Sequence, residues 1–258
     1  MATEWFTREY RCANGICVKT KFPAGGELKS ARPGTREYKR QVKRAEKNAM
    51  EAKHNAALQL NNSFRAKRDH MLGFDYSDEG LAALVTKAGT DDRDAVYLAA
   101  DREIHNWVRR VARACEKRGV PFRYFFVTSD MDGDTGEEKR VHHHLVVNAE
   151  AADICREKWT LGGVWDRKLR GGRCGDLTPV AEYMIDQVRQ IVPGKARYSA
   201  SRNLEPPKVM PLRRVRNPEA ELRVPKGAKL IYRSEAYAGR PQYLRYARGG
   251  GDDETDDG

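Results

Sequence analysis

Two stretches near the middle of the chain are rich in aromatic and β-branched residues and are separated by a polar loop. The first is FRYFFVTS at 122–129, the second is RVHHHLVVN at 140–148, and DMDGDTGEEK lies between them. Such residues favour a pleated, half-buried strand, and the polar connection favours pairing of the two neighbouring strands. The pattern therefore predicts a β-hairpin, which requires an antiparallel sheet.

Residues 91–118 carry apolar side chains at the 3.6-residue period of an amphipathic helix, and Gly119 is placed to end that helix. The positions that form the apolar stripe are Val96, Ala100, Ile104, Trp107, Val111 and Ala114. A shorter helix is predicted over 149–159, with Asn148 as its N-cap.

A third helix is predicted with Thr178 as its N-cap and Pro179 at the first helical position, and Pro193 with Gly194 suits the end. Its expected buried stripe is Val180, Met184, Val188 and Ile191. The adjoining polar face consists of Tyr183, Asp186, Gln187 and Gln190. A tyrosine at such a place is usually the edge of a core, but beside a cation its phenol can become a nucleophile.

The remaining predicted strands, together with the helices above, indicate an α+β domain. Residues 68–80 and 161–176 have the composition of strands between turns, and 8–22 form a predicted hairpin around Asn14–Gly15. The predicted division is a basic N-terminal hairpin, linker and helix at 1–61, the α+β domain at 62–205, and a C-terminal extension at 206–258.

Composition narrows the class of partner. The 258 residues are 33% charged with a net charge of +11, which favours nucleic acid first and an anionic membrane surface second. The chain has no apolar run of about 18 residues and no signal peptide, so we expect a cytoplasmic protein, with its five cysteines reduced. The acidic residues of 252–258 predict a disordered tail.

The predicted helix after the N-terminal linker has a basic face. Its lysines and arginines recur every three or four residues, which is the spacing of one helix face. They are Arg36, Lys39, Arg40, Lys43, Arg44 and Lys47. This face is either simply solvated or a contact for the DNA backbone, to which we add Arg202 as a further candidate.

The histidine run HHH has a geometry that suits a metal. On a strand His142 and His144 point the same way, about 6.6 Å apart along the backbone, while His143 points to the opposite face. Asp130 at the end of the preceding strand, or less favourably Asp132, could supply a third ligand. The alternative is a purely structural role, with the imidazoles hydrogen-bonded on the sheet.

A calcium loop in DMDGDTG is excluded. Its sixth position is Thr135 where such a loop needs glycine, and its twelfth is Val141 where it needs glutamate.

Together, VTSDMDGDTGEEKRVHHHLVVN, LTPVAEYMIDQVRQ and ARYSASRNLEPPKV resemble the HUH endonucleases. More narrowly, they resemble the single-tyrosine rolling-circle replication initiators (Rep) of small phages and plasmid-like bacterial elements. The resemblance covers about 68–208. One departure is Asp186, at a position where this family often has lysine; Gln187 or Arg189 could substitute for that lysine.

The resemblance implies an HUH/Rep-type, ferredoxin/RRM-like fold, with a central antiparallel sheet of about five strands and packed helices. It implies that His142, His144 and Asp130 hold Mg²⁺ or Mn²⁺, and that Tyr183 attacks single-stranded or hairpin origin DNA to form a 5′-phosphotyrosine link. Tyr198 is the competing nucleophile. Since the chain has no nucleotide-binding P-loop, a host helicase and polymerase are the expected partners.

Other functions remain open on the sequence alone. A conjugative relaxase or a transposase of the same superfamily would share this chemistry. A non-catalytic, basic DNA-binding protein with structural histidines would bind DNA without metal and form no covalent product. A histidine-triad nucleotide hydrolase is excluded, because it needs three histidines that alternate with apolar residues on one face.

Overall fold

The computed structural model describes residues 4–24, 36–133, 135–189, 191, 196–235 and 241–249, with the backbone alone over 36–47. The helices are α1 (Arg36–Ser63), α2 (Asp78–Ala88), α3 (Arg93–Lys117), α4 (Ala152–Lys158) and α5 (Thr178–Asp186), with short 3-10 turns at Ala149–Ala151 and Arg173–Gly175. The strands are β1 (Trp5–Arg11), β2 (Ile16–Pro23), β3 (His70–Asp75), β4 (Tyr124–Met131), β5 (Glu138–Val147), β6 (Val164–Lys168), β7 (Ser199–Ala200), β8 (Lys208–Val209), β9 (Arg213–Val215), β10 (Lys229–Arg233) and β11 (Gln242–Ala247).

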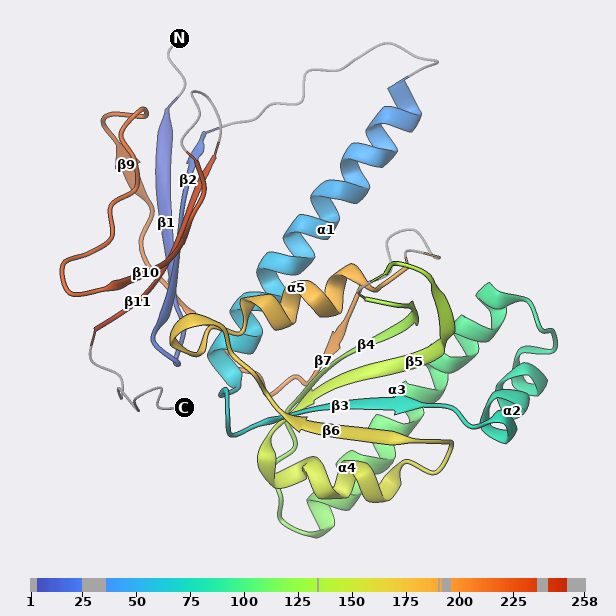
Figure 1. Ribbon diagram of the computed structural model, residues 1–258. Coiled ribbons are helices and arrows are strands. Elements are labelled where there is room, and N and C mark those ends of the chain that lie inside the picture. The colour runs from blue at the N-terminus through green and yellow to red at the C-terminus, as the bar shows by residue number, and fades with distance from the viewer. Residues whose placement is uncertain are drawn as a thin grey trace.

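A five-stranded antiparallel sheet is the centre of the molecule, with strand order β6-β3-β5-β4-β7 (Figure 1). The prediction of an α+β fold with such a sheet is confirmed, as is the β4–β5 hairpin. Strand β5, which carries the three histidines, lies in the middle of the sheet and pairs with β3 and β4. A residue on β5 is therefore flanked on both sides, and its side chain must point to one face or the other.

Each face of this sheet is covered by helices and has its own core. Helices α2, α3 and α4 cover one face, where Trp107 packs against Phe74 and Leu145 is fully buried. Helices α1 and α5 cover the other, where Leu60, Met184 and Phe125 are buried together. Alternation along β5 sends His143 into the first layer and His142 and His144 toward the second.

A second antiparallel sheet joins the two ends of the chain. Its order is β10-β11-β2-β1-β8, with β9 also paired to β1 (Figure 1). The predicted division placed 1–61 and 206–258 in separate segments; the structure instead unites β1 and β2 with the C-terminal strands. The edge of β2 is completed by β11, which satisfies backbone groups that a lone hairpin would leave unpaired.

The helices differ from the predictions in three places. A turn was predicted at the end of 68–80, where α2 begins instead, and Ser77 caps that helix by accepting a hydrogen bond from the Gly80 backbone. The Asn148 side chain caps no helix, because it accepts from the Arg123 N–H and donates to Pro121 instead. Helix α5 ends at Asp186 rather than near Pro193, so Val188 does not continue its stripe.

Candidate functional site

His142 and His144 lie side by side on the face of β5 that α5 covers. Their ring centroids are 4.9 Å apart, and His144 is buried whereas His142 is partly exposed. The predicted His-x-His pair is therefore present on one face. The Nδ1–H of His142 donates to the Arg140 carbonyl at 2.9 Å, which leaves its Nε2 lone pair available to a cation.

Tyr183 is brought to this pair by helix α5. The start of the helix is held by Asp176, which accepts hydrogen bonds from the backbone and hydroxyl of Thr178. Ala181 and Met184 are fully buried and anchor the helix to the sheet. As a result the Tyr183 ring lies 5.6 Å from the His144 ring, centroid to centroid.

Gln187 completes the group from the end of α5. Its side-chain oxygen lies 3.1 Å from Nε2 of His144, and its side-chain nitrogen donates to the Tyr183 carbonyl at 3.0 Å. The second bond fixes the amide so that its oxygen faces the histidine. Gln187 is only 3% exposed, and Ser129 donates to its backbone carbonyl. The amide oxygen of Gln187 therefore lies beside the histidine pair, within hydrogen-bond distance of His144.

His144 is neutral near pH 7. Burial, and then the neighbouring His142, lower its pKa to about 4. Its Nδ1 is buried and has no hydrogen-bond partner among the described residues. A buried polar atom is usually paired, so this nitrogen has a binding position that the described residues do not fill. Two imidazoles and one amide oxygen form a set of N and O donors that suits a divalent cation.

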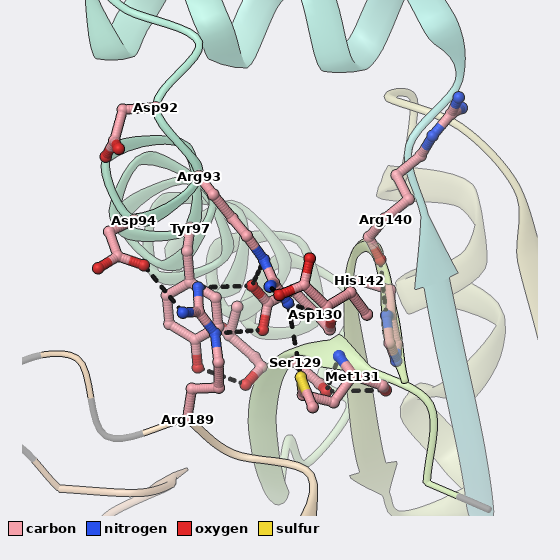
Figure 2. Close-up of polar contacts among 12 residues, drawn as sticks. Asp92, Arg93, Asp94, Tyr97, Ser129, Asp130, Met131, Arg140, His142 and Arg189 are labelled. Atoms are coloured by element: carbon pink, nitrogen blue, oxygen red, sulfur yellow. Dashed lines mark hydrogen bonds and ion pairs between the residues drawn. The ribbon is translucent and has the colours of Figure 1, made fainter. Parts of the chain in front are cut away.

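Asp130 does not lie beside the histidines, contrary to the prediction. Figure 2 shows its carboxylate turned toward Arg93 and Arg189. Arg189 donates to both carboxylate oxygens, at 2.8 and 2.6 Å, and Arg93 donates to one of them at 2.8 Å. Ser129 is the residue opposite His142, so alternation places Asp130 on the α3 face of the sheet.

The other predicted site residues are also dispersed. Asp132 forms an ion pair with Lys139, and within the described residues no three His, Cys, Asp or Glu side chains form a metal-binding group. Asp186 is exposed and pairs with Lys53 of α1, and Arg189 is held by Asp130 and Asp94. Of the three supporting candidates, only Gln187 therefore contacts the histidine pair.

Tyr198 lies apart from the His142–His144 pair in the sheet. It stacks on Phe125 with centroids 4.6 Å apart, and burial raises its pKa. Arg202 is exposed beyond the start of β4, whereas the histidines pair with its far end. The side chains of Arg36, Lys39, Arg40, Lys43, Arg44 and Lys47 lie outside the described residues, as do Gln190 and the acidic tail.

Two contacts around the site were not anticipated. Trp165 of β6 lies over Gly73 of β3, where an added Cβ would overlap its indole, and its ring is 5.9 Å from that of His144. A Cβ at Gly133 would stand 2.7 Å from the Tyr183 ring. A glycine inside a strand often marks such a close approach, and Gly73 was the available signal in the sequence.

His143 is the centre of a buried hydrogen-bonded chain behind the site. Its Nε2 lies 2.8 Å from the Tyr76 hydroxyl and its Nδ1 lies 3.1 Å from the Thr128 hydroxyl, which donates to Asp101. Burial lowers the pKa of His143, so the ring is neutral. Since Thr128 donates onward, His143 donates from Nδ1 and Tyr76 donates to Nε2.

Replacing His143 by leucine is expected to lower the free energy of unfolding by about 1–3 kcal/mol, because it leaves the Tyr76 hydroxyl unpaired in the core, whereas Thr128 keeps its bond to Asp101. Adding Tyr76→Phe is expected to restore part of the loss, since that unpaired donor is then removed. Urea unfolding of both variants measures this. An equal or greater loss of unfolding free energy in the double variant would contradict the hydrogen bonds assigned to His143.

Comparisons with known proteins identify no relative. The chain matches no protein-family model, and neither a curated protein nor a solved structure was found to match it. Within the part of the chain that the structure describes, no helix is both long and apolar enough to cross a membrane. Function must therefore be argued from the chemistry of the His142–His144–Tyr183–Gln187 group.

Proposed function

We propose that this protein is a metal-dependent endonuclease that nicks and rejoins single-stranded DNA through Tyr183. The observation that carries the proposal is the gathering of His142, His144, Gln187 and Tyr183 on one face of β5 and the adjoining end of α5. A tyrosine beside two imidazoles and an amide oxygen combines a nucleophile with a cation-binding set.

In the proposed reaction His142, His144 and Gln187 would hold Mg²⁺ or Mn²⁺, with Gln187 in the role first assigned to Asp130. Such an ion would supply Lewis-acid stabilisation of the charge that develops on the oxygens of the scissile phosphate. Tyr183 loses its phenolic proton and its oxygen bonds to phosphorus. The bond from phosphorus to the 3′ oxygen breaks, and that oxygen takes up a proton.

The phosphotyrosine ester conserves the free energy of the phosphodiester bond that was broken. Tyr183 is left with a 5′-phosphotyrosine link, and the released strand has a free 3′ hydroxyl that can prime synthesis. A 3′ hydroxyl can also attack the phosphotyrosine and rejoin the strand. Initiation of rolling-circle replication, with a host helicase and polymerase, is the role we propose; a relaxase or transposase role would use the same chemistry.

A denaturing gel tests the activity. The protein is incubated with Mn²⁺ and labelled single-stranded DNA from its own genetic element, and a protease-sensitive shifted band is expected. Chelator, and separately His144→Ala, are expected to abolish that band. If the wild-type protein binds this DNA tightly but forms no adduct on any fragment tested, the protein is a DNA-binding protein with structural histidines.

Gln187→Ala is expected to weaken Mn²⁺ binding by about 10–100-fold, because it removes the oxygen that faces His144. Isothermal titration with Mn²⁺ measures the affinity. The matched control is Glu182→Ala, an exposed residue on the same helix, which is expected to leave the affinity within about twofold. Equal affinities for Gln187→Ala and wild type would remove Gln187 from the ligand set.

A further inference from the structure

The second sheet and its connecting segments carry a large excess of positive charge. Residues 4–24, 206–235 and 241–249 contain fourteen lysines and arginines and five aspartates and glutamates, an excess of nine. The whole chain has a net charge of +11. A small sheet needs no such charge to fold, and a concentrated positive charge raises the local concentration of a polyanion.

One face of this sheet is already occupied by protein. Leu222, Val224 and Ala228 pack against Cys17 and Leu244. On the same face the Lys21 ammonium donates to the carbonyls of residues 218 and 220, at 2.6 and 2.8 Å. A partner of any size must therefore use the opposite face, which is turned toward α1.

The face turned toward α1 is only partly filled by core residues. Ile16, Val18 and Ala247 pack there with Leu58 of α1. Beyond them the strand pairing aligns aromatic and arginine side chains in rows across the strands. One row holds Tyr232 and Arg245, the next holds Tyr243, Thr20 and Arg8, and the third holds Phe22, Phe6 and Arg214.

Two of these aromatic rings are open to solvent. Tyr232 is 50% exposed and Tyr243 is 38% exposed, and the Arg245 guanidinium lies 5.6 Å from the centre of the Tyr232 ring. Arg8 has no carboxylate partner among the described residues. Exposed aromatic rings beside arginine side chains offer both stacking surfaces and positive charge to a nucleic-acid strand.

We propose that this arginine–tyrosine face, formed by Arg8, Thr20, Tyr232, Tyr243 and Arg245, binds single-stranded DNA as a second contact outside the nicking site. The choice of DNA as the polymer rests on the proposed function. Bases stack on the tyrosine rings and Arg8 contacts a phosphate, while Arg245 stays paired with Asp176 and lies against the Tyr232 ring. This combination suits single strands because a duplex hides the faces of its bases.

The sheet is held directly against the helix that carries Tyr183. Asn14 donates to the Asn61 side chain at 2.7 Å, and that same oxygen accepts from the backbone of Leu177 at the start of α5. Arg245 forms an ion pair with Asp176 at 2.9 Å. A strand bound on the arginine–tyrosine face would therefore be positioned relative to the nucleophile.

Fluorescence anisotropy of a labelled oligothymidine tests this, in chelator and in a Tyr183→Phe background so that no cleavage contributes. Arg8→Ala with Tyr243→Ala is expected to weaken binding by at least about tenfold. Tyr243→Phe keeps the ring and is expected to retain the affinity. The matched control is Arg109→Ala, which removes an exposed arginine from α3.

Three results would overturn the inference. They are a change of less than twofold for the double variant, equal affinity for duplex and single-stranded DNA, or a loss of self-association in place of a loss of DNA binding. The two proposals fail separately. If the wild type never forms an adduct but the double variant loses affinity, the nicking activity is wrong and the arginine–tyrosine face stands.

Discussion

Tyr183→Phe is expected to abolish the covalent protein–DNA adduct, lowering its rate of formation by about three orders of magnitude or more. The substitution removes the one oxygen that attacks phosphorus, and the phenylalanine ring keeps the packing against His144. The Tyr183 hydroxyl has no hydrogen-bond partner in the described part of the chain, so stability is expected to stay close to that of the wild type. Denaturing gels and thermal unfolding measure the two effects.

Tyr198→Phe is the matched control for this variant. Tyr198 is stacked on Phe125, and burial raises its pKa, which opposes formation of the phenolate that would attack DNA. We expect the rate of adduct formation to stay within about twofold of the wild type. Loss of the adduct in Tyr198→Phe, with activity kept in Tyr183→Phe, would show that the nucleophile is misassigned.

Asp130→Ala is expected to lower the free energy of unfolding by about 3 kcal/mol and to leave Mn²⁺ affinity unchanged. Asp130 is 2% exposed and binds two arginines, so its removal takes away their shared buried acceptor and leaves them only the exposed carboxylates of Glu138 and Asp94. It also releases the contact that ties the segment after α5 to the start of α3. Urea unfolding and Mn²⁺ titration separate the structural role from the ligand role.

Asp94→Ala provides the comparison. Asp94 pairs with the same Arg189, but its carboxylate is 54% exposed, and exposed ion pairs contribute little to stability. We expect a loss below about 1 kcal/mol. If Asp130→Ala instead unfolds like the wild type and loses its metal, Asp130 is a ligand and its placement with the arginines is wrong.

The sequence by itself was enough to place the paired histidines and the main helix. Two-residue alternation puts His142 and His144 on one face whatever the rest of the fold does, because successive side chains on a strand oppose each other. The apolar period of 91–118 likewise predicted α3, which the structure shows at Arg93–Lys117. Pro179 indicated the start of α5, but the N-cap is Leu177 rather than the predicted Thr178, whose hydroxyl donates to Asp176.

Tertiary structure decided which side chains join that pair. Asp130 is close to the histidines in the hairpin, yet strand register opposes Ser129 to His142 and turns Asp130 toward Arg93 and Arg189. Gln187 reaches His144 because α5 ends at Asp186 and Gln187 turns back to hydrogen-bond Tyr183. A shift of one residue along a strand moves a side chain to the other face, so the ends of loops and helices determine which side chains lie beside the histidine pair.

The second sheet could not be predicted from local pattern. Its strands lie at opposite ends of the chain, and the pairing of β2 with β11 joins residues more than 200 positions apart. Neither segment buries enough apolar surface alone, and only their pairing satisfies both strand edges and creates the arginine–tyrosine face. Local sequence determines the apolar periodicity of each helix or strand and the residues that cap a helix. Long-range pairing selects one partner strand among many possible ones. That choice depends on residues far apart in the chain, so only the folded structure reveals it.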